Sequence, residues 1–214
     1  MVEAIQELRG RLLDSQSNMS KIAIELNTSC PNIPNSPPSG YTFGSLVPLL
    51  TVLATARSKD HSLTIGLKLP PYVYENQFAE VIAILQSFTS LLADGEKSHF
   101  AFLTCTNTLG NCLLFSDQTM ASTNQEFAVP TALGGLAGQA LHPLALGNVF
   151  RFRQLLSSQE TRYATLMDLK IIGVGGVTSK EAAERMKKAG ADVIGCATLF
   201  GKEGVRAFEI LGKD

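Results

Sequence analysis

The sequence predicts an α/β fold built around a parallel β-sheet. Short, β-rich apolar runs alternate along the chain with longer segments in which apolar residues recur at helical spacing. Clusters of Pro, Gly, Asn and Ser follow several of the short runs, as expected where a strand ends in a loop. The 214 residues, of which 45% are apolar, suffice for a single domain with a hydrophobic core.

Five segments have the length and composition of β-strands, and we place them near residues 22–26, 64–68, 100–104, 170–173 and 193–196. Six segments have helical periodicity, namely residues 1–14, 43–57, 76–92, 144–156, 179–189 and 202–211. Residues 27–41 should form a loop, and residues 112–138 an irregular insertion with room for a small hairpin. Strands that alternate with helices pair in parallel, either in a doubly wound sheet or in part of a (β/α)8 barrel.

Composition and cysteine spacing exclude several classes of protein. The net charge of −1 gives no indication of a nucleic-acid partner, and no apolar run approaches the roughly 20 residues that span a bilayer. Residues 1–14 are amphipathic and partly acidic, unlike a signal or transit peptide. None of the four cysteines forms a CxxC pair or has metal-ligand spacing. We therefore expect a cytoplasmic protein with no membrane partner and no metal site.

Two consecutive strand-end loops contain the residue types of a phosphate site. Gly175 and Gly176 follow the fourth predicted strand, where glycine lets backbone N–H groups approach an anion closely. Ala197 and Thr198 follow the fifth strand and would add N–H groups and a hydroxyl. Phosphate sites after the last two strands are common in (β/α)8 barrels. The alternative interpretation is that the glycine pair makes only a tight turn.

Polar residues also follow the other predicted strands. Lys68 ends an apolar strand, where it would face an electron-accepting ring such as a flavin; the alternative is a lysine that reaches solvent. Cys30 lies in a loop and would serve as nucleophile or proton acceptor, although a packing role is the simpler interpretation. Asn27, Asn32 and Asn107 offer uncharged amides that suit a planar, imide-like ligand if they converge, but singly each is more often a turn residue.

Six motifs, in the same order, resemble those of dihydroorotate dehydrogenases. They are E-L-N-T-S-C-P-N at 25–32, L-K-L-P-P-Y at 67–72, N-T-L-G-N at 107–111, G-G-L-A-G at 134–138, I-G-V-G-G-V at 172–177 and K-E-G at 202–204. The cysteine at position 30 resembles the cytosolic, fumarate-linked class, because the membrane-associated, quinone-linked class has serine there. The resemblance extends from about residue 20 to the end of the chain.

The resemblance implies an FMN enzyme of pyrimidine synthesis that oxidises dihydroorotate to orotate. Cys30 would remove the proton from C5 of dihydroorotate, the hydride from C6 would pass to N5 of FMN, and fumarate would reoxidise the flavin. The implied substrate contacts are Asn27, Asn32, Asn107 and Thr108. The implied FMN contacts are Asn27, Lys68, Thr106, Gly138, Gly175, Gly176, Ala197 and Thr198. The full-length enzyme would be a homodimer.

The resemblance also implies a fold. Residues 1–214 would form a single FMN-binding domain, a partial TIM (β/α)8 barrel of about five C-terminal βα units that lacks the N-terminal barrel strands. Two residues depart from the family's pattern: Thr108 replaces serine and keeps the hydroxyl, whereas Ala197 replaces glycine and keeps the backbone N–H. The alternatives are a related FMN barrel reductase of the dihydropyrimidine or dihydrouridine type, and a truncated relative without catalytic activity.

Overall fold

The computed structural model describes residues 1–14, 21–29, 38–91, 98–118, 125–158 and 161–212. Within these residues the main sheet contains five strands: β1 (Ala23–Asn27), β2 (Thr64–Leu69), β3 (Phe102–Cys105), β6 (Lys170–Val174) and β7 (Val193–Gly195). Each neighbouring pair is parallel, and the spatial order β1-β2-β3-β6-β7 follows the chain without reversal. A doubly wound sheet reverses its strand order at a switch point, whereas barrel strands follow the chain. The predicted fold class, a partial (β/α)8 barrel, is therefore confirmed.

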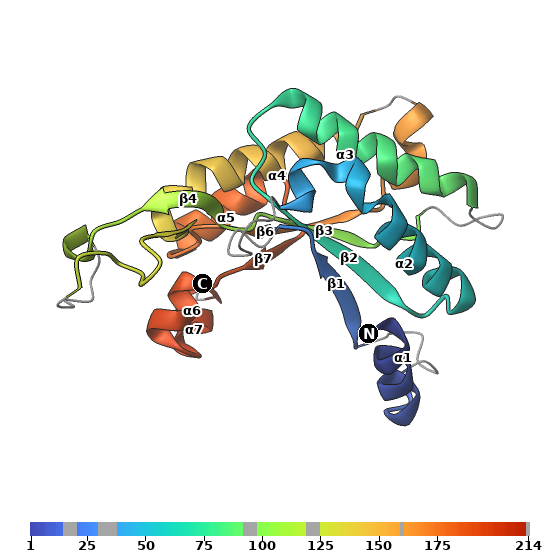
Figure 1. The fold of residues 1–214 in the computed structure, drawn as a ribbon, viewed down its shortest axis with the longest axis horizontal. Helices are drawn as coiled ribbons and strands as arrows, with labels where there is room; N and C mark the ends of the chain where they lie inside the picture. The colour runs from blue at the N-terminus through green and yellow to red at the C-terminus, as the bar shows by residue number, and fades with distance from the viewer. Residues whose placement is uncertain (15–20, 30–37, 92–97, 119–124, 159–160, 213–214) are drawn as a thin grey trace.

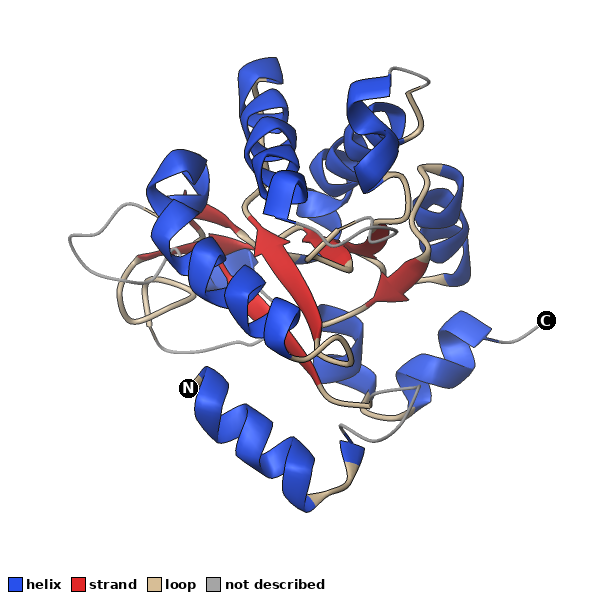
Figure 2. Ribbon diagram, turned by 90° about the vertical axis from the view of Figure 1, so that its right-hand side faces the viewer, coloured by secondary structure: helices blue, strands red, loops and turns tan. Residues whose placement is uncertain are grey.

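Helices connect the successive strands and cover one face of the sheet. Figure 1 shows α2, α3 and α4 together on one side of the strands, and Figure 2 shows the strands at the centre of the molecule. The helices are α1 (Val2–Arg11), α2 (Val47–Lys59), α3 (Glu75–Ser87), α4 (His142–Leu156), α5 (Lys180–Lys188), α6 (Thr198–Glu203) and α7 (Arg206–Gly212). Since right-handed crossovers place the helices outside a barrel, the opposite face of the sheet corresponds to the barrel interior.

Strand β2 shows how side chains alternate between the two faces of the sheet. Ile65, Leu67 and Leu69 are fully buried and pack into the core beneath the helices, while Lys68 lies on the opposite face. Burying one such aliphatic side chain contributes about 1.5–3 kcal/mol. Residue 66 is glycine because a Cβ there would lie 2.1 Å from the ring of Phe102. The period-two pattern thus anchors one face in the core and presents polar residues on the other.

Several element boundaries differ from the predicted ones. Strand β3 begins at Phe102, because Phe100 packs edge-on against Phe88 at 5.8 Å instead of joining the sheet. The helix predicted over 202–211 is two helices, since Gly204 has a φ of +56° and ends α6. The helix predicted over 43–57 begins as a 3₁₀ turn and becomes α-helical at Val47. At Phe100 the apolar character of the residue alone does not show whether it packs in the core or pairs in a strand.

The insertion after β3 contains a small hairpin, which the sequence allows. Strands β4 (Leu109–Leu113) and β5 (Leu133–Leu136) pair antiparallel, and the pair projects from one end of the sheet in Figure 1. A register irregularity separates the pairings of Leu109 and Cys112. The hairpin returns the chain to Gly138 and the start of α4, close to the carboxyl ends of the main strands.

One buried arginine holds helix α1 against the turn before β2. The Arg9 side chain is 0% exposed, and its guanidinium donates hydrogen bonds to Asp14 at 3.0 Å and to Asp60 at 2.7 Å. It also donates to the side chains of Gln6 and Ser62. A buried charge is tolerated when its donors are satisfied in this way.

Candidate functional site

The carboxyl ends of the main strands and the loop after β5 surround one cavity of about 90 Å³. This is the end of a (β/α)8 barrel that carries the active site. Cys30 and Asn32 lie outside the described residues. Asn27 ends β1 and contacts the cavity wall through Asn107. The other predicted site residues all line the cavity, namely Lys68, Thr106, Asn107, Thr108, Gly138, Gly175, Gly176, Ala197 and Thr198.

The loop after β6 brings bare backbone to the cavity. Gly175 has a φ of +137° and Gly176 a φ of +64°, conformations that side chains rarely adopt. A Cβ on Gly176 would lie 2.5 Å from the carbonyl oxygen of Gly138, and a Cβ on Gly175 would lie 2.5 Å from the Cβ of Ala145. Both positions therefore require glycine, and the chain segments here approach one another more closely than a tight turn alone needs.

The loops after β5 and β7 close the same end of the cavity. Gly138 has a φ of +68°, and a Cβ built there would lie 3.8–3.9 Å from the side chain of Thr198. Ala197 and Thr198 begin the segment that follows β7. Backbone from three loops thus converges at one end of the cavity, an arrangement that suits an anionic group.

Thr106 carries a hydroxyl that has no hydrogen-bond partner among the described residues. The residue is 3% exposed, its Oγ1 is buried, and it lines the same cavity as Lys68. Buried hydroxyls in folded proteins are nearly always paired, so an unpaired one in a residue that lines a cavity points to a ligand-binding role for that residue. Lys68, half-buried and in register with Asn27 on β1 and Thr104 on β3, brings a positive charge to the same wall.

Asn107 ties the loop after β3 to the loop after β1. Its Nδ2 donates to the Asn27 side-chain oxygen at 3.0 Å and to the backbone carbonyl of Ser29. The same Asn27 oxygen accepts the backbone N–H of Ser29 at 3.2 Å. Thr28 adds two hydrogen bonds to the carbonyl oxygen of Lys68, from its N–H at 3.0 Å and its hydroxyl at 2.8 Å. The chain is therefore firmly held up to the residue before Cys30.

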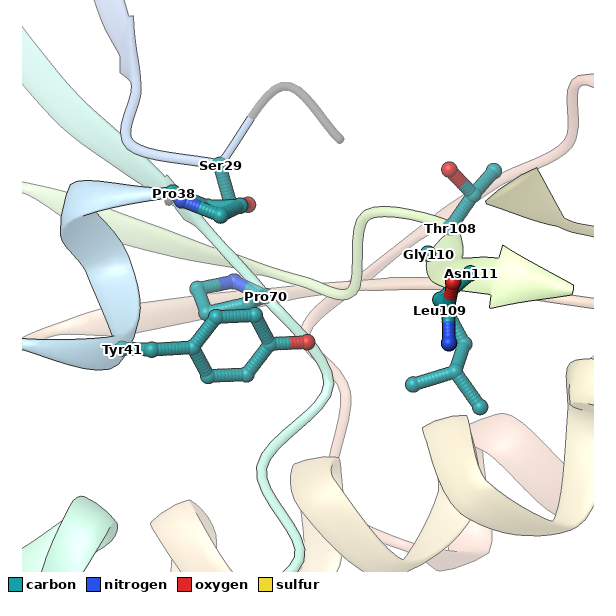
Figure 3. Close-up of a pocket in the computed structure, with 8 residues that line it drawn as sticks. All are labelled: Ser29, Pro38, Tyr41, Pro70, Thr108, Leu109, Gly110 and Asn111. Atoms are coloured by element: carbon teal, nitrogen blue, oxygen red, sulfur yellow. The ribbon is translucent and has the colours of Figure 1, made fainter. Parts of the chain in front are cut away.

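A second cavity, of about 240 Å³, lies between the residues on either side of 30–37 and the start of the β4 hairpin. Figure 3 shows the Tyr41 hydroxyl pointing across it toward Thr108 and Leu109. Burial raises the pKa of Tyr41, so its hydroxyl remains a neutral donor at physiological pH. Ser29 and Pro38, which flank residues 30–37 in the sequence, also line this cavity. Thr108 lines both cavities.

No role was expected for His142 or Arg185 from the sequence, but His142 contacts the loop after β6 and Arg185 contacts His142. The Nδ1 atom of His142 lies 2.8 Å from the carbonyl oxygen of Gly175, and the Nε of Arg185 donates to His142 Nε2 at 3.3 Å. The only signal in the sequence is that His142 follows the G-G-L-A-G motif by four residues.

Cys105 is a packing residue, because burial raises the pKa of its thiol far above the ordinary range.

Two kinds of feature are absent from the described part of the chain. No helix within it has both the length and the apolar character needed to cross a membrane. No group of three or more His, Cys, Asp or Glu side chains in that part of the chain is arranged to hold a metal ion.

The fold and the cavity define the class of protein: an α/β-barrel type with a cavity, lined in part by glycine backbone, at the carboxyl ends of its strands. A family model described as dihydroorotate dehydrogenase matches residues 11–214. The chain therefore belongs to the dihydroorotate dehydrogenase family, whose members are generally flavin-dependent.

Curated relatives agree with this assignment. The chain is 32% identical over 186 residues to the "Probable dihydroorotate dehydrogenase A (fumarate)" of Streptococcus pneumoniae, covering 86% of this chain and 50% of the relative. It is 29% identical over 191 residues to the putative enzyme of the same name from Streptococcus agalactiae, covering 89% and 53%. The putative enzyme from Streptococcus uberis is 31% identical over 185 residues, covering 86% and 50%. The chain thus spans about half the length of the curated relatives it matches.

Proposed function

We propose that this chain supplies the flavin-binding side of a dihydroorotate dehydrogenase, which oxidises dihydroorotate to orotate in pyrimidine synthesis. The observation that carries the proposal is the cavity at the strand ends, where bare glycine backbone, the unpaired hydroxyl of Thr106 and the charge of Lys68 meet. A ligand that suits them has an anionic end and a planar end with hydrogen-bond acceptors. FMN has both.

The residues present fit FMN in two groups. Backbone N–H groups of the three converging loops would hold its phosphate, because glycine at 175 and 176 lets these chain segments approach one another closely. Thr106, Lys68 and Asn27 would hold the ring. The phosphate contacts are Gly138, Gly175, Gly176, Ala197 and Thr198. When bound, FMN supplies the acceptor for the hydride that leaves C6 of dihydroorotate.

The protein's own residues bind the substrate and move its proton. Asn27, Asn32, Asn107 and Thr108 would orient the pyrimidine through neutral amide and hydroxyl groups. Cys30 would take the C5 proton from the substrate face opposite the flavin, since base and hydride acceptor must act on different sides. The Lys68 ammonium would stabilise the negative charge that develops on the ring.

Together with this activity we propose a domain organisation, an electron acceptor and an oligomeric state. Residues 1–214 would act as one FMN-binding domain, and the free edges of β1 and β7 would pair with further strands to close the barrel. The relatives' names and the cysteine at position 30 support fumarate as the electron acceptor. The working enzyme would be a cytoplasmic homodimer.

The test of the proposal has two stages. Purified protein should bind FMN and show flavin absorbance; a protein that binds no flavin would favour the alternative of a non-catalytic relative. Replacing Cys30 with alanine should then slow flavin reduction by dihydroorotate about 10²–10⁴-fold, because a positioned base is lost. Rapid mixing, with the rate normalised to bound FMN, measures this step.

Two controls separate a base from a packing residue. Cys30→Ser should recover part of the rate only at higher pH, because a hydroxyl is a weaker proton acceptor than a thiolate. Cys112→Ala, on the β4 hairpin, should leave the normalised rate unchanged. An unchanged rate per bound flavin in Cys30→Ala would end the base assignment. Rapid flavin reduction by dihydropyrimidines or dihydrouridine, without reduction by dihydroorotate, would favour a related reductase.

A further inference from the structure

A buried histidine holds the loop after β6 from the side away from the cavity. His142 is the first residue of α4 and is 7% exposed. Its Nδ1 lies 2.8 Å from the carbonyl oxygen of Gly175, thirty-three residues further along the chain. On the other side of the ring, the Nε of Arg185 from α5 donates to His142 Nε2 at 3.3 Å. One imidazole thus links α4, the loop after β6, and α5.

The two contacts fix the protonation of the ring. Arginine has donors and no acceptor, so His142 Nε2 must accept from Arg185. The proton of the neutral ring is then on Nδ1, which donates to the carbonyl of Gly175. A doubly protonated ring would point one N–H at the Arg185 donor and lose that contact. Arg185 therefore selects the tautomer that can hold the loop.

The hydrogen bond from His142 to the Gly175 carbonyl determines the direction of the Gly176 N–H. In a planar trans peptide the carbonyl and the following N–H point in opposite directions. Since the Gly175 carbonyl faces His142, the N–H of Gly176 points away from His142, which does not itself line the cavity. Gly175 and Gly176 both line the cavity and lack side chains that could restrict their backbones. Their orientation must therefore be fixed from outside the loop.

We infer that His142, held in one tautomer by Arg185, is a positioning residue for the flavin phosphate: it fixes the Gly175–Gly176 peptide so that its N–H faces the anion. The inference rests on the proposed FMN site. It assigns a role to two residues that would not touch the flavin, and it deepens the phosphate half of that site. Without the histidine the glycine pair would sample other conformations, and the phosphate would have to restrict them on binding.

The experiment compares FMN with riboflavin, which has the same ring and no phosphate. Binding of each to the purified protein is measured by quenching of flavin fluorescence. In His142→Leu the affinity for FMN should fall roughly tenfold, the size expected when one hydrogen bond from the Gly176 N–H to the phosphate is weakened, while riboflavin affinity changes little. His142→Asn should recover part of the loss, because an asparagine Nδ2 replaces the donor Nδ1. Arg185→Met should weaken FMN binding in the same selective way.

His61 provides the matched control. It also pairs with an arginine, its Nδ1 lying 2.9 Å from Arg57, but on the exposed surface and away from the cavity. His61→Leu should leave both affinities unchanged. A second readout needs no flavin: nitrogen-15 NMR of the histidine rings should show Nδ1 of His142 protonated and Nε2 bare.

The outcomes distinguish the inference from the function on which it rests. Equal weakening of FMN and riboflavin in the His142 and Arg185 variants would show a purely structural role and overturn the inference, as would the opposite tautomer. Unchanged FMN preference in all three variants would also overturn it. A wild-type protein that binds riboflavin as tightly as FMN would instead refute the phosphate site of the proposed function. If His142→Leu does not fold, His142→Asn and Arg185→Met decide the matter.

Discussion

Two buried polar regions of this protein differ in where their hydrogen bonds go. Around Arg9 every contact described is internal: the guanidinium binds Asp14, Asp60 and neighbouring side chains at the end of the molecule away from the cavity. At the carboxyl ends of the strands the Thr106 hydroxyl is buried without a partner in the described chain. A polar region that satisfies itself stabilises the fold, whereas one with unused hydrogen-bonding capacity is built for a ligand.

The largest expected effect is on stability, from Arg9→Met. Removing the arginine leaves the carboxylates of Asp14 and Asp60 without their buried partner, which typically costs about 3–5 kcal/mol of unfolding free energy. Urea-induced unfolding measures the loss. Flavin affinity of the folded fraction should not change. Arg11→Met, on the exposed side of the same helix, is the control and should stay within about 0.5 kcal/mol of wild type.

Next in size is the effect of Gly176→Ala on flavin binding. The methyl group would meet the Gly138 carbonyl, and φ of +64° is unfavourable for alanine, so FMN affinity should fall about a hundredfold. Gly147 in α4 has open space around its Cβ position, and Gly147→Ala should stabilise the protein by about 0.5–1 kcal/mol. If Gly176→Ala bound FMN normally, the close backbone approach would have no role in binding.

The sequence predicted the cavity lining better than it predicted the contacts that hold the lining in place. The residues that line the cavity follow strands, and β-strands are visible as apolar runs whose ends must share one edge of a parallel sheet. His142 was missed because its partners, Gly175 and Arg185, are distant in sequence. The boundary inside residues 202–211 was missed although Gly204, an evident helix breaker, stands there.

Thr106→Val should separate binding from stability. Valine keeps the shape and removes an unpaired hydroxyl, so the unfolding free energy should stay within about 0.5 kcal/mol or rise, while FMN affinity falls about tenfold. Thr104→Val is the opposite case. Thr104 donates to Glu25 at 2.5 Å, so its replacement should cost about 1 kcal/mol and leave FMN binding unchanged. Equal behaviour of the two variants would erase the distinction between a hydroxyl that is satisfied within the protein and one that is free for a ligand.

The smallest predicted effect concerns acid stability at the Arg9 region. Burial opposes ionisation of Asp60, but hydrogen bonds from Ser62, Gln6 and Arg9 outweigh it and lower the pKa of this carboxyl. A lowered pKa in the folded state contributes stability that is present above the unfolded pKa and is lost as pH falls. Between about pH 5 and about pH 3, wild type should therefore lose about 1 kcal/mol more than Asp60→Asn. Parallel pH curves would contradict the assignment.

The most direct test of the central claim, that the loops after β6 and β7 form a flavin phosphate site, is a crystal structure of the protein grown with FMN. The phosphate oxygens should lie within hydrogen-bonding distance of the backbone nitrogens of Gly176 and Thr198, with the ring beside Lys68 and Thr106. A phosphate bound away from these two loops, or a flavin bound elsewhere on the protein, would contradict the claim.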